Sequence, residues 1–366
     1  RNPPPPGLSG LCERFGGSLP LQRRMSVHLG QIGSYSQAKL RRIKQVQFSV
    51  WGPEEIRRLS VTTKTNYDNV SIPDGITKFE AYLNGVAQYG SVSDPRMGTS
   101  ERGARCSTCD GGLVRMSSGK QENNCPGHFG HINLAKPVYH PGFIKQVVEC
   151  LSCVCFSCGR IVADRNEKYR RALRIRDPQK RLAVLASLCK TKTQCEFSTK
   201  EQNEALLDGL DGVERPDADE DGRTPCGAWL PKFRKDGLGI SIEYHRNDEQ
   251  VGADQRQYLS AEKAHRALQR ISREDSIAMG FDPRWVQPDW LIITVLPVSP
   301  PHVRPTVMEG GMQSKDDITY QLINIVKVNA TLESEVARGQ PPHIIEQTER
   351  LLQVKVANLF DNGSAG

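Results

Sequence analysis

The stretch Cys106-Ser-Thr-Cys109, resumed at Cys125-Pro-Gly-His128-Phe-Gly-His131, decides how the rest of the chain is interpreted. Two ligands separated by two residues can bind one ion from a single tight turn. A second such pair completes the tetrahedral set that Zn²⁺ prefers. His131 stays in reserve, because His128 gives the two-residue spacing. The predicted ligands of this first zinc site are Cys106, Cys109, Cys125 and His128.

A second cysteine cluster follows. Cys155-Phe-Ser-Cys158-Gly159 has the form of a zinc knuckle, in which a glycine adopts the positive φ that the turn requires. Cys226-Gly227 repeats the Cys-Gly ending. For the remaining ligand, Cys195 borders a polar loop, whereas Cys189 ends an apolar run and is typical of a core thiol. The expected ligands of the second zinc site are Cys155, Cys158, Cys195 and Cys226.

An alternative ligand pair remains at the second site. Cys150 and Cys153 are also separated by two residues and form a competing pair at the second site. At the first site, residues 110–124 between the two ligand pairs are rich in Gly, Ser and Asn, which predicts a solvated loop. A zinc ion with four protein ligands has no open coordination position for catalysis. We therefore expect both ions to be structural.

Composition limits the class of protein. With 37% hydrophobic and 25% charged residues, the chain resembles a soluble globular protein of more than one core-bearing unit. No window is apolar for long enough to span a bilayer, so no membrane partner is expected. The 11 cysteines, mostly in metal-like spacings and without a secretory signal, favour a reducing compartment. A net charge of +7 is modest for this length, so its distribution matters more than its sum.

Local patterns predict the N-terminal elements. Residues 1–22 are rich in Pro and Gly and indicate disorder. Residues 39–50 begin basic and then alternate as a strand does. Pro53 followed by two acidic residues marks the start of a helix. Asp94-Pro-Arg-Met-Gly98 is expected to be a turn leading into the first zinc site.

Residues 160–192 carry the densest basic helical pattern in the chain. Such a run is usually a solvated helical face. The alternative hypothesis is that this segment, which lies between zinc ligands, is held rigidly toward a polyanion. In that case Arg170, Arg171 and Arg174 are the expected nucleic-acid-binding residues. Residues 201–221 are strongly acidic instead and predict an exposed loop inside the second zinc unit.

The C-terminal part alternates helices and one strand. Residues 260–271 predict an amphipathic helix capped by Ser260, and a second short helix begins at Ser272 and ends at Gly280. Residues 290–296 form a continuous apolar run typical of a buried strand, stopped by Pro297. Two further helical patterns, expected to pack as an antiparallel pair, cover residues 316–328 and 342–359.

These motifs together resemble the N-terminal clamp of the largest subunit of multisubunit RNA polymerases. The resemblance rests first on the Cys106 to His131 stretch and on Leu134-Ala-Lys-Pro-Val138. It covers about residues 43–362 and is closer to the eukaryotic RNA polymerase II subunit than to its I or III counterparts. Further matching segments are Asp94-Pro-Arg-Met-Gly98, Leu188-Cys-Lys-Thr-Lys192, Arg234-Lys-Asp-Gly-Leu238, Trp290-Leu-Ile-Ile-Thr-Val-Leu-Pro-Val298, Val303-Arg-Pro305 and Asp316-Asp317.

The resemblance implies an α+β fold, an irregular multi-element clamp module with two structural zinc sites and a C-terminal antiparallel helical hairpin. That family binds one ion through Cys-x₂-Cys…Cys-x₂-His and another through four cysteines, which matches the two ligand sets above. The loop between Cys109 and Cys125 is longer than the family's usual one. The implied divisions are a tail at 1–38, a clamp core with the first zinc site at 39–148, a clamp head with the second zinc site and basic helix at 149–260, a return strand and lid at 261–317, and a helical hairpin at 318–366 that stops before the active-centre region.

The implied role is to close over template DNA and the RNA–DNA hybrid. Residues 297–317 correspond to the lid, with Val307 and Met308 as its apolar edge and Arg304 and Lys315 steering phosphates. The family's catalytic motif, Asn-Ala-Asp-Phe-Asp-Gly-Asp, holds Mg²⁺ through three carboxylates and does not occur in this sequence. The resemblance therefore implies no catalytic residue here, and Mg²⁺ only in the complete polymerase.

The implied partners are the second-largest and smaller RNA polymerase II subunits, with initiation and elongation factors at the helical hairpin, in the nucleus. Two other classes were weighed. A RING-type ubiquitin ligase needs a sulfur ligand soon after His128, but His131 stands there and the next cysteine is Cys150. A free-standing zinc adaptor that binds nucleic acid is the remaining alternative.

Overall fold

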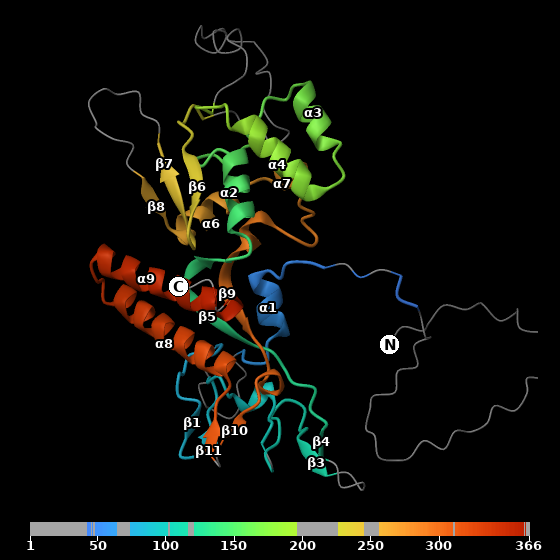
Figure 1. Ribbon diagram of the computed structural model, residues 1–366, viewed down its shortest axis with the longest axis vertical. Coiled ribbons are helices and arrows are strands. Elements are labelled where there is room, and N and C mark those ends of the chain that lie inside the picture. Colours follow the sequence, from blue (N-terminus) through green and yellow to red (C-terminus); the bar gives the residue numbers. More distant parts are fainter. Residues whose placement is uncertain are drawn as a thin grey trace, which may run out of the picture. The chain divides into compact units, whose positions relative to one another are not determined.

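The computed structural model describes residues 42–44, 46, 48–63, 74–101, 103–115, 121–195, 226–244, 256–309, 312–361 and 363. Residues 1–47 and 48–366 form two separate units, and all helices and strands named below belong to the second (Figure 1). The disorder expected at 1–22 and the acidic loop expected at 201–221 lie outside the described residues.

The N-terminal part of the second unit begins with helix α1 (Pro53–Leu59). Pro53 occupies its first turn, and the backbone N–H of Gly52 donates a hydrogen bond to the Glu55 carboxylate over 3.2 Å. The predicted helix start is therefore confirmed. The strand expected just before it is wrong, because the described residues there have no regular structure and Phe48 is 84% exposed. With no neighbouring strand to pair with, alternation alone does not make a strand.

A long antiparallel pair joins distant parts of the chain. Strand β5 (Gly130–Tyr139) pairs with β9 (Ile292–Val298), and their register shifts between Asn133 and Val138. The buried strand expected at 290–296 is confirmed about two residues further on, after the 3₁₀ turn η2 (Pro288–Leu291). Pro297 lies inside β9 rather than ending it. This is possible because β5 is the only partner of β9 among the strands that the structure describes, so the other edge of β9 needs no N–H donor.

The C-terminal helices α8 (Asp317–Ala337) and α9 (Pro342–Phe360) lie side by side and antiparallel (Figure 1). They confirm the predicted helical pair, although α8 extends well beyond the predicted residue 328. The pair is fixed to the sheet by Gln353, whose side-chain amide both accepts from the Tyr139 N–H (2.7 Å) and donates to the Tyr139 carbonyl (2.8 Å). One hydrophobic cluster joins the hairpin to the β5–β9 pair, including Ile132, Leu296, Leu322, Ile325, Val326, Leu352 and Val356.

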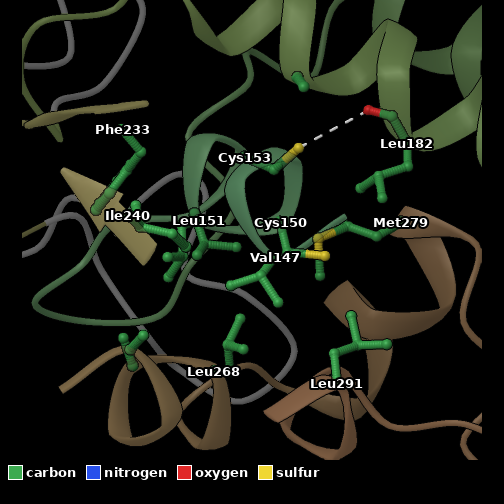
Figure 2. Packing of buried hydrophobic residues seen from close by; sticks show 14 of the residues in the cluster. Val147, Cys150, Leu151, Cys153, Leu182, Phe233, Ile240, Leu268, Met279 and Leu291 are labelled. Carbon is green, nitrogen blue, oxygen red and sulfur yellow. Dashed lines mark hydrogen bonds between the residues drawn. The ribbon is translucent and has the colours of Figure 1, made fainter. Parts of the chain in front are cut away.

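A second hydrophobic cluster is built around α2 (Ile144–Cys153). Figure 2 shows Val147, Cys150, Leu151 and Cys153 of this helix facing side chains from several other elements. Both thiols are fully buried. The surrounding elements are α4 (Pro178–Cys189), β6 (Lys232–Asp236), β7 (Gly239–Glu243), β8 (Gln257–Leu259), α6 (Ala261–Gln269) and α7 (Arg273–Met279).

Helix caps explain the boundaries in this cluster. Ser260 caps α6 and Ser272 caps α7, and Gly280 ends α7 with φ 103°, as the sequence predicted. The basic segment expected to be one helix is instead two, α3 (Glu167–Leu173) and α4. The break occurs because Asp177 caps a new helix through its side chain, with Pro178 in the first turn.

The remaining elements are short. The segment between the first two ligand pairs was expected to be a loop, but its described ends form an antiparallel hairpin. Within the described ranges, no helix is long and apolar enough to cross a membrane. The short elements are β1 (Tyr82–Leu83), β2 (Val86–Ala87), η1 (Pro95–Met97), β3 (Leu113–Arg115), β4 (Gln121–Asn123), η3 (Pro301–Val303), β10 (Val307–Glu309) and β11 (Met312–Ser314).

Candidate metal centres and nucleic-acid surface

Two turns form the first candidate metal centre. In the first, the Asp110 N–H donates to the Cys106 carbonyl over 2.9 Å, and Asp110 adopts a positive φ of 55°. In the second, the N–H of Gly127 points to the sulfur of Cys125, with 3.4 Å between nitrogen and sulfur. Such N–H groups stabilise a thiolate. In the first turn the N–H of Thr108 likewise points to the sulfur of Cys106, with 3.4 Å between nitrogen and sulfur. The backbone of each turn is thus arranged for a negatively charged sulfur ligand.

The predicted turn before this centre supports it directly. The 3₁₀ turn η1 accepts hydrogen bonds from the centre through its carbonyls: the His128 N–H donates to Met97 (3.0 Å) and the Thr108 hydroxyl to Arg96 (2.7 Å). Arg96 is itself held by a buried ion pair with Asp94, 2.7 Å between Nη2 and Oδ2. The expected turn at 94–98 is confirmed.

The ligand geometry suits a zinc ion. An ion 2.3 Å from sulfur and about 2.0 Å from nitrogen separates tetrahedral ligand atoms by about 3.5–3.8 Å. The Sγ of Cys125 and the Nε2 of His128 are 3.8 Å apart. All four candidate ligand atoms lie within 4.8 Å of one another, on Cys106, Cys109, Cys125 and His128.

The pKa shifts of the candidate ligands indicate how a cation would bind at this centre. Burial lowers the pKa of His128, which favours the neutral imidazole that binds metals. Burial raises the pKa of the Cys125 thiol to about 12, so in the absence of a cation this sulfur keeps its proton. Metal binding here therefore releases a proton and weakens as the pH falls.

The second candidate centre combines a knuckle at Cys155 to Gly159 with two segments that are distant in the chain and meet at Cys195 and Gly227. The Gly159 N–H donates to the Cys155 carbonyl (2.8 Å), and the Gly227 N–H donates to the Cys195 carbonyl (2.9 Å). Both glycines have a positive φ, 77° and 69°. The prediction that Gly159 adopts this conformation is confirmed. One local turn and one pairing of two distant segments thus bring four thiols together.

The sulfur spacings at the second centre match a tetrahedron. The Sγ atoms of Cys155 and Cys226 are 3.5 Å apart, and those of Cys158 and Cys195 are 3.8 Å apart. Hydrogen bonds from the thiols of Cys155 and Cys195 lower the pKa of Cys158 to about 2. The lowered pKa of Cys158 favours the thiolate, which is the form of cysteine that binds metals.

The competing residues lie elsewhere. Cys150 and Cys153 face the hydrophobic cluster (Figure 2), and the Cys153 thiol points to the Leu182 carbonyl, 4.0 Å from sulfur to oxygen. Cys189 is a core thiol, as its apolar surroundings in the sequence suggested. His131 is fully buried, with Nδ1 2.7 Å from the Ser60 hydroxyl. In the described part of the chain, the ligand groups contain only the eight residues predicted.

The basic segment exposes its cations on α3 and on the turn that follows. Within the described ranges, Arg170 and Arg174 are exposed and form no ion pair. Arg171 pairs with Glu167 across one helical turn, 2.5 Å between Nη2 and Oε1, but both side chains are more than two-thirds exposed. Exposed ion pairs of this kind contribute little to stability, so the arginine can readily exchange its carboxylate partner for another anion.

The hairpin β10–β11 contains the residues assigned to the lid edge. Val307 and Met308 lie on β10, opposite Ser314 and Gln313 of β11. Strand β11 pairs back onto β10 with Glu309 opposite Met312. The prolines before it do support a short turn, η3.

Arg304 was expected to steer phosphates and does not reach solvent. Only 4% of it is exposed, and its guanidinium donates to the Ser299 carbonyl (3.0 Å) and the Thr319 hydroxyl (3.2 Å). That expectation is corrected: Arg304 fixes the base of the hairpin to α8. Lys315, by contrast, is half-buried and keeps part of its side chain at the surface.

Fold and ligand groups together define an α+β protein with two cysteine-rich centres suited to structural zinc. Residues 40–366 match the protein family RNA polymerase Rpb1, domain 1, and the chain belongs to this family. It is thus part of the largest subunit of a DNA-directed RNA polymerase, an enzyme of transcription that assembles with other subunits and acts on nucleic acids. The resemblance inferred from the sequence is confirmed at this level.

Proposed function

We propose that this chain is the N-terminal clamp of the RNA polymerase II largest subunit, and that it closes over template DNA and the RNA–DNA hybrid in the nucleus. The observation that carries the proposal is the exposed cationic surface of α3, which contacts α4. Helix α4 packs on α2, and the chain runs from each of these helices into ligands of that centre. Because these helices are already packed, the backbone that carries the cations does not have to be ordered when a polyanion binds.

Both centres bind zinc in this proposal, on Cys106, Cys109, Cys125 and His128 and on Cys155, Cys158, Cys195 and Cys226. Each ion is structural, since four protein ligands fill a tetrahedral zinc. The proposed clamp core is residues 39–148 with 261–317, and the proposed head is 149–260. Two separate hydrophobic clusters, around β5–β9 and around α2, support a division into two parts, although the α2 cluster also includes residues of α6 and α7 from the proposed core.

The nucleic-acid contact is sequence-independent. Each phosphate neutralised on duplex DNA releases counterions and adds about 0.9 to the slope of log affinity against log salt. Reversal of Arg170, Arg171 and Arg174 to Glu is expected to weaken DNA binding and to flatten that slope. The matched control reverses Lys145, Lys235 and Lys263, which are exposed and lie on α2, β6 and α6. Equal losses in both triple variants would reduce the effect to net charge alone.

The β10–β11 hairpin acts as the lid in this proposal. Its apolar residues Val307 and Met308 compete with base stacking at the upstream end of the hybrid, and Lys315 attracts the neighbouring phosphates. Deletion of 307–314 in the assembled polymerase is expected to leave catalysis and zinc content intact. The transcript should then stay paired beyond the normal hybrid length on single-stranded templates. Deletion of 116–120, between β3 and β4, is the control, and unchanged RNA displacement in the lid variant would refute the role.

The remaining partners follow from the same proposal. The chain assembles with the second-largest and smaller RNA polymerase II subunits, and initiation and elongation factors bind at the α8–α9 hairpin. Mg²⁺ belongs to the complete polymerase and has no proposed ligand in this chain. Affinity purification with the hairpin surface intact or mutated at the exposed Val336 and Arg338 tests factor binding. Retention of every factor by the mutant would remove the hairpin from the proposal.

A further inference from the structure

The first metal centre contacts a residue that no ligand pattern includes. His302 lies on η3, at the base of the β10–β11 hairpin and far from the ligands in sequence. Its Nε2 is 2.8 Å from the side-chain nitrogen of Asn123. The Asn123 side-chain oxygen in turn accepts the backbone N–H of Cys125 over 3.0 Å. A chain of two hydrogen bonds thus leads from the hairpin base to a metal ligand.

The direction of these hydrogen bonds is fixed by chemistry. Because the Asn123 oxygen accepts from Cys125, its amide nitrogen is the donor toward His302. That nitrogen also donates to the Thr99 carbonyl over 2.8 Å. Nε2 of His302 must therefore accept, and the neutral ring carries its proton on Nδ1. Asn123 is satisfied on both sides only when His302 is in place.

Close packing reinforces the connection. A Cβ added to Gly98 would lie 2.7 Å from the His302 ring and 3.1 Å from the Cys125 sulfur. A Cβ added to Gly127 would lie 2.9 Å from Pro300 and 3.0 Å from Nδ1 of His302. Both glycines have a positive φ. The hairpin base therefore occupies the space that side chains at these two glycines would fill. The ligand turns and the hairpin base are packed so closely that neither can move far without the other.

The hairpin base is rigid on its other side as well. Arg304, two residues after His302, is anchored to the carbonyls of Ser299 and Val92 and to Thr319 at the start of α8. His302 and Arg304 are therefore two fixed points of the turn that precedes the hairpin, and loss of the His302 contact removes one of them. Outer-layer partners of this kind orient metal ligands and alter metal affinity.

We propose that His302 is a positioning residue that joins the first metal centre to the base of the β10–β11 hairpin, so that metal occupancy sets the hairpin's position. The inference rests on zinc binding at the first centre. It does not depend on what the hairpin does to a transcript. No described residue links the second centre to the hairpin in this way, so the ion at the second centre serves as an internal reference.

The test compares His302→Ala with His302→Gln and with His343→Ala, a control at an exposed position of α9. Zinc release to a chelator is followed together with hydrogen exchange of 121–128 and 299–314. The Ala variant is expected to release one of its zinc ions about 10- to 100-fold faster. It should also exchange faster in both segments. The Gln variant, whose amide oxygen can accept from Asn123, should restore part of both effects, and His343→Ala should match the parent.

The outcomes separate the inference from the zinc proposal. Parent-like zinc release and exchange in His302→Ala would overturn the inference, whatever the zinc content. Faster exchange at 121–128 without any change at 299–314 would overturn it too, because the two segments would not be joined. A parent protein that contains zinc only at the second centre would instead refute zinc binding at the first. Exchange in metal-free parent and His302→Ala proteins would then still decide whether the two segments are joined.

Discussion

Two cysteines five residues apart, Cys153 and Cys158, provide a sharp test of the second metal centre. Cys158 is one of four clustered thiols, whereas Cys153 is fully buried in the hydrophobic cluster around α2. We predict that Cys158→Ala removes one of two zinc ions and unfolds the surrounding head, while Cys153→Ala retains both ions. The chemical change is identical, so only the role of the sulfur differs.

The magnitudes are far apart. Removing the Cys153 sulfur leaves a small void and forfeits a weak contact to the Leu182 carbonyl, which should cost about 1–3 kcal/mol. Structural zinc binding is worth about 10–16 kcal/mol at neutral pH. A domain as a whole is stable by only about 5–15 kcal/mol. Loss of the ion therefore exceeds what the head can tolerate, whereas loss of the Cys153 sulfur does not.

The assay combines elemental analysis with hydrogen exchange on purified protein. The parent and Cys153→Ala should each contain two zinc ions per chain, and Cys158→Ala should contain one. In Cys158→Ala, exchange should become fast over α2 and α4 and remain slow over α8 and α9. Equal zinc content in the two variants, or loss of zinc in Cys153→Ala, would refute the ligand assignment.

Two further predictions concern the hydrophobic clusters and their borders. Burial raises the pKa of Glu349 above its usual 4.5, so this residue costs stability as the pH rises through that value and is neutral in both states at lower pH. Glu349→Gln should therefore raise the melting temperature at pH 8 and leave it unchanged at pH 4. A lower melting temperature of the variant at pH 8 would show that the ion pair with Lys136 outweighs the cost of burial. Leu322→Ala, at a fully buried position of α8, should lower the free energy of unfolding by about 2–5 kcal/mol in chemical denaturation. The control Leu351→Ala, at an exposed position, should stay within about 0.5 kcal/mol of the parent. Similar losses in both variants would contradict the packing described.

The metal centres were predictable because their chemistry is local. The spacing of Cys106 to Cys109 and of Cys155 to Cys158 already places two sulfurs on one turn. The polarity of neighbouring residues, which reports burial, indicated that Cys195 rather than Cys189 lies with the other three thiols. Helix caps such as Ser260 were predictable for the same reason, since a cap acts within a few residues.

What the sequence did not reveal depends on distant contacts. The burial of Arg304 requires the Val92 carbonyl and α8, which lie far away in the chain. Its charge alone suggested a surface role. Likewise, Pro297 is tolerated inside β9 because only β5 pairs with that strand, and strand order cannot be derived from local pattern. His302 carried no signal at all, because its partner Asn123 precedes it by more than a hundred residues.

Closure of the clamp is the central claim, and a distance measured in the assembled polymerase tests it most directly. A donor dye at Ser187, exposed on α4, and an acceptor on the facing lobe of the second-largest subunit would report the gap by energy transfer. We predict that transfer rises when template DNA and the RNA–DNA hybrid are loaded, and that Glu at Arg170, Arg171 and Arg174 reduces the rise. Identical transfer with and without nucleic acid would contradict the assignment of this chain as the clamp.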